Sequence, residues 1–348
     1  AGEPKDFYGA DPDAMAFASF ITQFLSVYNL WNSPKYLMGE SYGTFRSAIL
    51  SNILETQGGV ALNGVIQLSQ TMNYNNWIAK HDPGTDLPFE LALPSYTAVA
   101  WYHHKLPDRP EKLEPLLKEV QHFAMTDYAY ALSQGFLLDS VSFNEMAEKL
   151  HNYTGLPVDY IRKANLRVGG HQFQHELLSG DGLVASRLDG RFTGYSLDPL
   201  GEFSIYDPGF STIIKPLIAT FNNYVHTQLK FGVGETYAPF GNTNIISQWD
   251  FTHKLSDEYF NFYTNVMPDL AKAMIFNPRL KIMLNMGYFD MTTPFGKALY
   301  ETHHLPIAKA LQKNIEYYYY YSGHFIFLNK EAHKELHDNV AKFIEETH

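Results

Sequence analysis

The sequence predicts an α/β protein with a mostly parallel sheet and an inserted, mainly helical cap. Near the start, a short apolar strand, a helix and a second strand follow in the order of a parallel crossover unit, at residues 36–38, 42–54 and 64–70. The same alternation returns near the end of the chain, whereas the middle carries helical and turn-rich patterns. We therefore expect two core segments around one cap, with boundaries at 1–78, 79–250 and 251–348.

The first core segment opens with a predicted helix from Asp11 to Leu30. Asp11 is a suitable N-cap, and Pro12 suits the first turn. The apolar side chains recur on one face of this helix: Phe17, Phe20, Ile21, Phe24, Leu25 and Tyr28. Because an apolar helix face needs a cover, we expect the sheet to lie against it.

The cap and the last core segment have different patterns. In the cap, a helical stretch over 110–136 precedes a turn-rich stretch over 179–202. The last core segment alternates strand and helix, at 279–286, 294–305, 314–323 and 330–346. Its second strand contains five consecutive tyrosines, residues 317–321. Since side chains alternate across a strand, both faces of this strand must be covered.

Composition disfavours several classes of partner and site. The net charge is −11, so nothing attracts the chain to nucleic acid or to anionic lipid. There is no cysteine, which excludes disulfides, thiolate metal sites and cysteine nucleophiles. No window approaches the roughly eighteen apolar residues that span a bilayer. We therefore expect no nucleic acid, no membrane and no metal or organic cofactor.

The stretch "YLMGESYGTF" predicts a catalytic serine. Ser41 lies between Gly39 and Gly43, after an apolar strand and before a helix. In a strand-to-helix elbow the nucleophile is held in a strained conformation, and its neighbours two residues away must be small. The amino end of the following helix points at the site, where the N–H of Tyr42 is positioned to stabilise an oxyanion.

An acid and a base follow in the order that such a nucleophile requires. In "LNMGYFDMTTP", Asp290 comes just after one predicted strand, and in "YYYYYSGHF", His324 comes just after the next. A serine hydroxyl becomes reactive when a histidine takes its proton and an acid orients that histidine. The alternatives are a solvated loop aspartate and a histidine at the edge of the core. The shared position at strand ends favours a Ser41, Asp290, His324 triad.

These blocks resemble the serine carboxypeptidase family, particularly its cysteine-poor bacterial branch. The resemblance rests on "GESYG", "GYFDMTTP" and "SGHF", and extends to "SRLDGRFTG", "NPRLKIMLNMG" and "WNSP". It implies an α/β-hydrolase fold with a helical cap, and a serine peptidase that releases carboxyl-terminal residues from peptides. It also implies export to the periplasm or the exterior.

The resemblance implies a substrate-binding role for Glu40. In the family, the glutamate of the nucleophile motif helps to bind the terminal carboxylate of the peptide through a shared proton. A buried carboxyl near another acid has a raised pKa, so activity is expected to favour acidic pH. The alternative for Glu40 is a structural acid that pairs with the elbow backbone. Thr44 and Phe325 stand where many relatives have glycine and methionine, and Phe325 is expected beside the substrate pocket.

The sequence departs from the family before the serine. In the family, a second oxyanion donor comes from an "Asn-Gly-Gly" loop upstream, together with several strands. About forty residues precede Ser41, and they are occupied by one helix and one strand. A central strand without neighbours leaves buried backbone groups unpaired, each at a cost of about 1–3 kcal/mol. We therefore expect this chain to be a fragment whose companion is an amino-terminal segment or chain.

Other functions stay open. The same triad would serve an esterase or acyltransferase, because related folds use it for several reactions. A non-catalytic binding protein that kept the hydrolase shape is a third possibility. In "HQFQHE", His171 and His175 are spaced to face one way on a helix, which suits zinc, but cap or surface histidines are the simpler interpretation.

Overall fold

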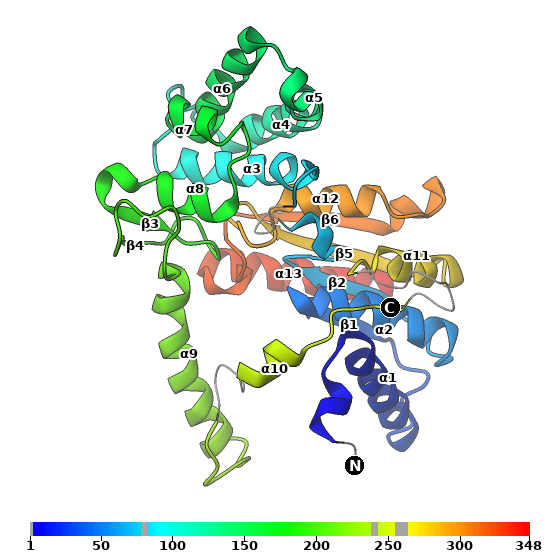
Figure 1. Cartoon of the computed structure of the whole chain (residues 1–348). Helices are drawn as coiled ribbons and strands as arrows, with labels where there is room; N and C mark the ends of the chain where they lie inside the picture. Colours follow the sequence, from blue (N-terminus) through cyan, green and yellow to red (C-terminus); the bar gives the residue numbers. More distant parts are fainter. Residues whose placement is uncertain (1–2, 78–81, 238–242, 255–263) are drawn as a thin grey trace.

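The computed structural model describes residues 3–77, 82–237, 243–254 and 264–348 (Figure 1). A four-stranded parallel sheet forms the core, with its strands in the order β1-β2-β5-β6. Their bounds are β1 Tyr36–Glu40, β2 Gly64–Leu68, β5 Lys281–Gly287 and β6 Ile315–Tyr320. The predicted α/β architecture with a mainly parallel sheet is therefore confirmed.

The register of the sheet brings the carboxyl ends of the strands together. Glu40 at the end of β1 pairs with Leu68 at the end of β2, which in turn pairs with Asn285 of β5. Gly287 at the end of β5 pairs with Tyr320 at the end of β6. In open parallel sheets this edge is where functional loops gather.

Helices cover both faces of the sheet. On one face, α2 packs against β1 and β2, and α1 and α11 pack against α2. On the other face, α13 buries Ala332, Leu336 and Phe343 against Ile66 and Met283. The bounds of these core helices are α1 Ala10–Val27, α2 Tyr42–Thr56, α11 Met267–Phe276, α12 Phe295–His303 and α13 Lys330–Thr347. Among the described helices, none is long and apolar enough to cross a membrane.

The prediction for α1 was wrong in two respects. The aromatic face expected to lie under the sheet is exposed, with Phe20 61% and Tyr28 62% accessible. The helix instead packs on α2 through small residues, Ala10, Ala14 and Ala18, because alanines allow two helices to approach closely. The N-cap is Gly9 rather than Asp11, whose carboxylate accepts the backbone N–H of Lys254 at 3.0 Å.

The middle of the chain is mainly helical, as predicted, and it contains one small sheet. Figure 1 shows α3 lying between α12 and helices α4 to α7, so α3 joins the two parts. The turn-rich stretch contains an antiparallel strand pair that the sequence did not reveal. The elements are α3 Leu87–Tyr102, α4 Leu113–Phe123, the π-helical η3 Ala124–Tyr128, α5 Ala129–Gln134, α6 Ser140–Thr154, α7 Val158–Lys163, α8 Gly170–Glu176, β3 Leu183–Ala185, β4 Thr193–Tyr195, α9 Pro208–Thr227 and α10 Thr243–Gln248.

The tyrosine strand β6 has two different faces. Tyr320 is fully buried under α13 and donates its hydroxyl hydrogen to Asn285 Oδ1 at 2.8 Å. Tyr317 and Tyr319, on the opposite face, are half-buried beside α12, where their rings lie 5.6 Å from His303 and 6.1 Å from Phe295. Each face of β6 therefore carries one buried and two half-buried side chains, and both faces are covered as predicted.

Candidate active site

Ser41 lies at a sharp turn between β1 and α2. Its φ of 55° and ψ of −120° are strained for a residue with a side chain, a feature common at functional sites. A Cβ atom on Gly39 would lie 2.2 Å from the carbonyl oxygen of Gly43, so only glycine fits at 39. A Cβ atom on Gly43 would meet nothing within 4 Å. The prediction that both positions need a small residue is therefore confirmed for Gly39 and wrong for Gly43.

Thr44 braces this turn. Its buried hydroxyl donates to the carbonyl oxygen of Ser41 at 2.7 Å and accepts the N–H of Thr71 at 2.9 Å. The N–H of Ser41 donates to the carbonyl oxygen of Leu68 at 3.0 Å. In the sequence, Thr44 stands out only because many relatives have glycine there, whereas its contacts show that it fixes the elbow to the loop after β2.

Asp290 and His324 form a buried pair at the ends of β5 and β6. Asp290 Oδ2 lies 2.8 Å from His324 Nδ1. Asp290 Oδ1 accepts the backbone N–H groups of Thr292 and Thr293 at 2.7 and 2.9 Å. The Thr293 hydroxyl lies 2.6 Å from Asp290 Oδ2 and donates to it. The two residues predicted to serve as acid and base are thus in direct contact.

The charges at this pair are fixed by its surroundings. Burial acts to raise the pKa of Asp290, but the imidazolium of His324 and the hydrogen bonds from Thr293 outweigh it, so the pKa is lowered. Burial acts to lower the pKa of His324, but the carboxylates of Asp290 and Glu40 outweigh it, so the pKa is raised. Asp290 is therefore ionised and holds the proton on Nδ1, which leaves Nε2 for chemistry.

Glu40 occupies the other side of the imidazole. Its Oε1 lies 3.2 Å from His324 Nε2, and the side chain is 31% exposed. The two atoms are close enough for an ion pair, but they do not form a hydrogen bond. Oε1 is buried and has no hydrogen-bond partner in the described part of the chain. Burial raises the pKa of Glu40, the charge on His324 lowers it, and Asp290 raises it, with a net rise.

Ser41 does not share a hydrogen bond with His324 in this arrangement. Across the residues that the structure describes, the imidazole edge at Nε2 faces Glu40 instead. Ser41 follows Glu40 directly in the chain, so both stand at the end of β1. Asp290 and Glu40 both lie beside the imidazole of His324. Ser41 is the next residue after Glu40 in the chain.

The side chain of Tyr42 anchors the start of α2. Its hydroxyl donates to Asp13 Oδ2 at 3.2 Å, and its ring meets those of Trp249 and Phe251 edge-on, at 5.5 and 6.2 Å. Its backbone N–H belongs to the first turn of a helix, where amides have no intrahelical acceptor. Such an amide is free to receive a negatively charged oxygen.

A loop of the middle segment supports the acid and the base. The N–H of His324 donates to the carbonyl oxygen of Leu188 at 2.6 Å, and the N–H of Met291 donates to that of Arg187 at 3.1 Å. From the core side, Ser69 Oγ donates to the carbonyl oxygen of His324 at 2.6 Å. No pattern in the sequence predicted these contacts, although "SRLDGRFTG" is one of the segments that carry the resemblance.

Phe325 lies beside the base. Its ring centroid is 5.3 Å from that of His324. It also lines a cavity of about 110 Å³ together with Leu188, Ile213 and Leu328. Phe325 therefore places an aromatic ring next to the imidazole, and its role in substrate binding stays a prediction.

Of the two histidines in "HQFQHE", His175 contacts the backbone of the protein. His175 is buried, and its Nε2 lies 3.0 Å from the carbonyl oxygen of Asp198. Within the described ranges, no group of three or more histidine or acidic side chains is placed to hold a metal ion. Nothing in these contacts favours the zinc interpretation of His171 and His175.

Comparison with known proteins finds no match to this chain among family models, curated proteins or solved structures. The geometry around His324 is therefore the basis for a functional assignment.

Proposed function

We propose that this chain is a serine hydrolase of the serine carboxypeptidase type, built on an α/β-hydrolase fold. The observation that carries the proposal is the convergence of a strained serine and a buried acid–histidine pair at one edge of a parallel sheet. Ser41 is the nucleophile, His324 the general base and Asp290 the residue that orients it. Strand-to-helix serines with these partners in this chain order are typical of acyl transfer.

The proposed reaction proceeds in two halves. Ser41 Oγ attacks the carbonyl carbon of the last peptide bond while His324 Nε2 takes the hydroxyl proton, and the N–H of Tyr42 stabilises the oxyanion. His324 then gives the proton to the departing amine, which leaves as the terminal residue and leaves an ester on Ser41. His324 then takes a proton from water, which attacks the ester carbonyl; the shortened peptide leaves as its carboxylic acid, and His324 returns the proton to Ser41 Oγ.

Glu40 gives the proposed enzyme its preference for mild acid. In the ionised state, Glu40 competes with Ser41 for His324 Nε2, which lies 3.2 Å away. Protonation removes this competitor and provides a donor for the terminal carboxylate of the peptide. Burial raises the pKa of Glu40, so the protonated form persists to higher pH than for an exposed glutamate.

A companion segment is also part of the proposal. β1 is an edge strand, and no strand in the described ranges pairs with its outer side. Beside it lies a cavity of about 590 Å³ lined by Met38, Glu40, Phe327 and Leu336, with Met38 58% exposed. An extended segment that adds to β1 would satisfy the open edge and cover this apolar surface.

A non-catalytic binding protein is the competing function. It is favoured by one observation, the contact of His324 with Glu40 in place of Ser41 in the described structure. An esterase or acyltransferase would use the same residues as the peptidase. These options differ in what the protein turns over, so substrate comparison separates them.

The test is hydrolysis of three matched substrates by the purified protein at mildly acidic pH. A blocked dipeptide with a free terminal carboxylate should be cleaved, and its terminal amide should be cleaved far more slowly. Equal rates for the two peptides, or turnover of a simple ester alone, would favour an esterase. No turnover of any of the three would favour the binding protein.

A further inference from the structure

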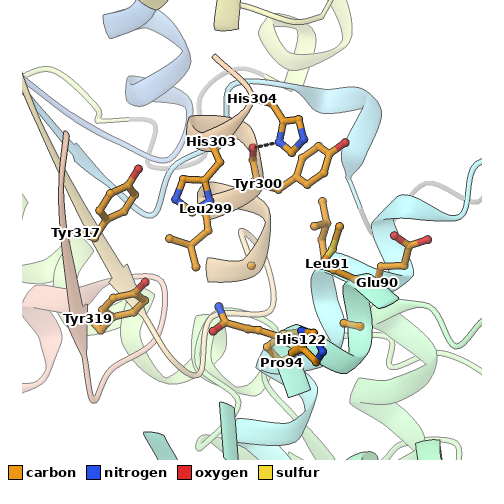
Figure 2. A pocket seen from close by; sticks show the side chains of 14 residues that line it. Glu90, Leu91, Pro94, His122, Leu299, Tyr300, His303, His304, Tyr317 and Tyr319 are labelled. Atoms are coloured by element: carbon orange, nitrogen blue, oxygen red, sulfur yellow. Dashed lines mark hydrogen bonds between the residues drawn. The ribbon is translucent and has the colours of Figure 1, made fainter. Parts of the chain in front are cut away.

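Another cavity lies far along the sheet from β1, at the junction of β6 with α3, α4 and α12. Its volume is about 520 Å³, within the roughly 300–1,000 Å³ typical of small-molecule sites. Figure 2 shows Tyr317 and Tyr319 on one side of it, and Leu91 and Glu90 on the other. The floor residues Glu90, Leu91 and Pro94 are buried, whereas His122 and His303 at the rim are exposed. The cavity is therefore open to solvent above a buried floor.

Glu90 is a buried acid without a partner. Its exposed fraction is 7%, and the described part of the chain offers it no hydrogen bond or ion pair. Arg167 neutralises the neighbouring acid Asp86, because its guanidinium binds both carboxylate oxygens of Asp86, at 2.6 and 3.0 Å. A carboxylate at the wall of a cavity, without a counter-charge from the described chain, favours a cationic ligand.

The walls provide flat apolar contacts. Tyr300, Tyr317 and Tyr319 line the cavity with Leu299. The ring of Tyr300 is itself stacked on His304, with centroids 3.9 Å apart, so its orientation is fixed. Partial desolvation of the ring lowers the pKa of His303, and His304 lowers it further, which disfavours a positive charge on this rim imidazole.

A π-helical turn forms another wall of the cavity. The helix widens over Ala124–Tyr128 directly after α4, and Ala124 and Met125 of this turn line the cavity. Such turns cost hydrogen-bond quality and often occur at functional sites. Methionine also adapts its shape to an apolar ligand.

We propose that this cavity binds a small organic ammonium ion with a flat apolar body, of the arylalkylamine class. The ammonium group would contact the carboxylate of Glu90, and the ring would pack between the tyrosines and Leu299. Tyrosine rings attract cations through their faces, which adds to the attraction of the acid. This site is independent of Ser41 and of the proposed hydrolysis.

The test is calorimetric titration of the protein with 2-phenylethylamine and with its uncharged analogue 2-phenylethanol at pH 8. The amine should bind at least about tenfold more tightly, the effect of one charge-assisted contact. Glu90→Gln should remove this difference, while Glu111→Gln, a change at an exposed glutamate outside the cavity, should keep it. Leu299→Trp, which fills the cavity, should weaken both ligands.

Acid should weaken binding of the amine. Burial raises the pKa of Glu90 to about 7, and the charge on Asp86 contributes, so the carboxylate is lost between pH 8 and pH 6. The other titratable groups that line the cavity are His122, Tyr300, His303, His304, Tyr317 and Tyr319. Binding of 2-phenylethanol should change much less over this range, which separates titration of Glu90 from a general loss of structure.

Several results would overturn the proposal. These are equal binding of the amine and the alcohol, full amine binding by Glu90→Gln, and full binding by Leu299→Trp. Tighter binding of phenylalanine than of phenylethylamine would show that the rim histidines recognise a carboxylate, and would also overturn it. If Glu90→Gln fails to fold, Leu299→Trp and the pH dependence decide. Peptide hydrolysis by folded Glu90→Gln should equal that of the unchanged protein, because Glu90 lies outside the triad.

Discussion

His324 lies between two carboxylates, with Nδ1 2.8 Å from Asp290 and Nε2 3.2 Å from Glu40. The two contacts have different characters. Asp290 is buried and held by four donors, whereas the Glu40 oxygen has no hydrogen-bond partner in the described structure. Asp290 is therefore a permanent partner of the base, and Glu40 is one that protonation can release.

Glu40→Gln should flatten the pH profile of hydrolysis. In the unchanged protein, kcat/KM should fall as rising pH ionises Glu40, whose pKa is raised by burial. The amide cannot ionise, so this fall should disappear. Loss of the Glu40 charge also removes one cause of the raised pKa of His324, so the acid limb should move to lower pH. The measurement is kcat/KM against pH, with Glu111→Gln as control, and an unchanged profile would contradict the role of Glu40.

Asp290→Asn should nearly abolish turnover while leaving substrate affinity intact. An amide stabilises neither the correct tautomer nor the imidazolium of His324, so kcat should fall by about 10³- to 10⁴-fold. Asp159→Asn, at a surface aspartate whose side chain is 94% exposed, is the matched control. Steady-state kinetics separate kcat from KM, and retention of a tenth or more of kcat would remove Asp290 from the triad.

The two glycines of the elbow should respond oppositely to alanine. Gly39→Ala places a Cβ atom 2.2 Å from the Gly43 carbonyl oxygen, so it should lower the free energy of unfolding by about 2 kcal/mol or more. Gly43→Ala meets no atom within 4 Å and lies in the first turn of α2, so it should be neutral or raise stability by up to about 1 kcal/mol. Urea unfolding of both variants checks this, and equal destabilisation would refute the assigned geometry.

His253 should make stability depend on pH in the alkaline range. It is buried between Asp11 and Asp269, at 2.5 and 2.9 Å, and although burial opposes its charge, these carboxylates raise its pKa to about 9. A raised folded-state pKa stabilises the fold fully below the unfolded value of about 6.5, and this contribution is lost as pH rises to 9. His253→Gln should therefore be most destabilising near pH 6, by about 3 kcal/mol.

The matched control for His253 is His337→Gln, whose side chain is 75% exposed beside Asp338. Unfolding free energies of the three proteins should be compared at pH 6, 7.5 and 9. The gap between the unchanged protein and His253→Gln should narrow with rising pH, and the gap for His337→Gln should stay near zero. A gap for His253→Gln that widens toward pH 9 would contradict the assigned charge.

The strands and the acid–base pair could be predicted because both depend on local patterns. Short apolar runs followed by glycine predicted β1 and β5, and parallel strands must end at a common edge, which predicted the contact of Asp290 with His324. The exposed face of α1 was mispredicted because aromatic periodicity is the same whether a face is covered or not. Alanines, which carry little hydrophobic signal, form its actual contact.

Other contacts between residues far apart in the sequence could not be predicted. The approach of Glu40 to His324 depends on which way each side chain leaves its strand end, and spacing in the sequence does not encode this. The support of His324 by Leu188 and Ser69 joins loops more than 100 residues apart in the chain. The burial of Glu90 could not be predicted either, because it results from the packing of α3 against its neighbours.

The most direct test of the proposed function is labelling by a fluorophosphonate, followed by peptide mass spectrometry. We expect one covalent adduct on the peptide that contains Ser41, formed faster than on free serine and absent in Ser41→Ala. Labelling should be strongly slowed in His324→Gln, since the imidazole must take the hydroxyl proton. A folded protein that gives no adduct at Ser41 would contradict the assignment.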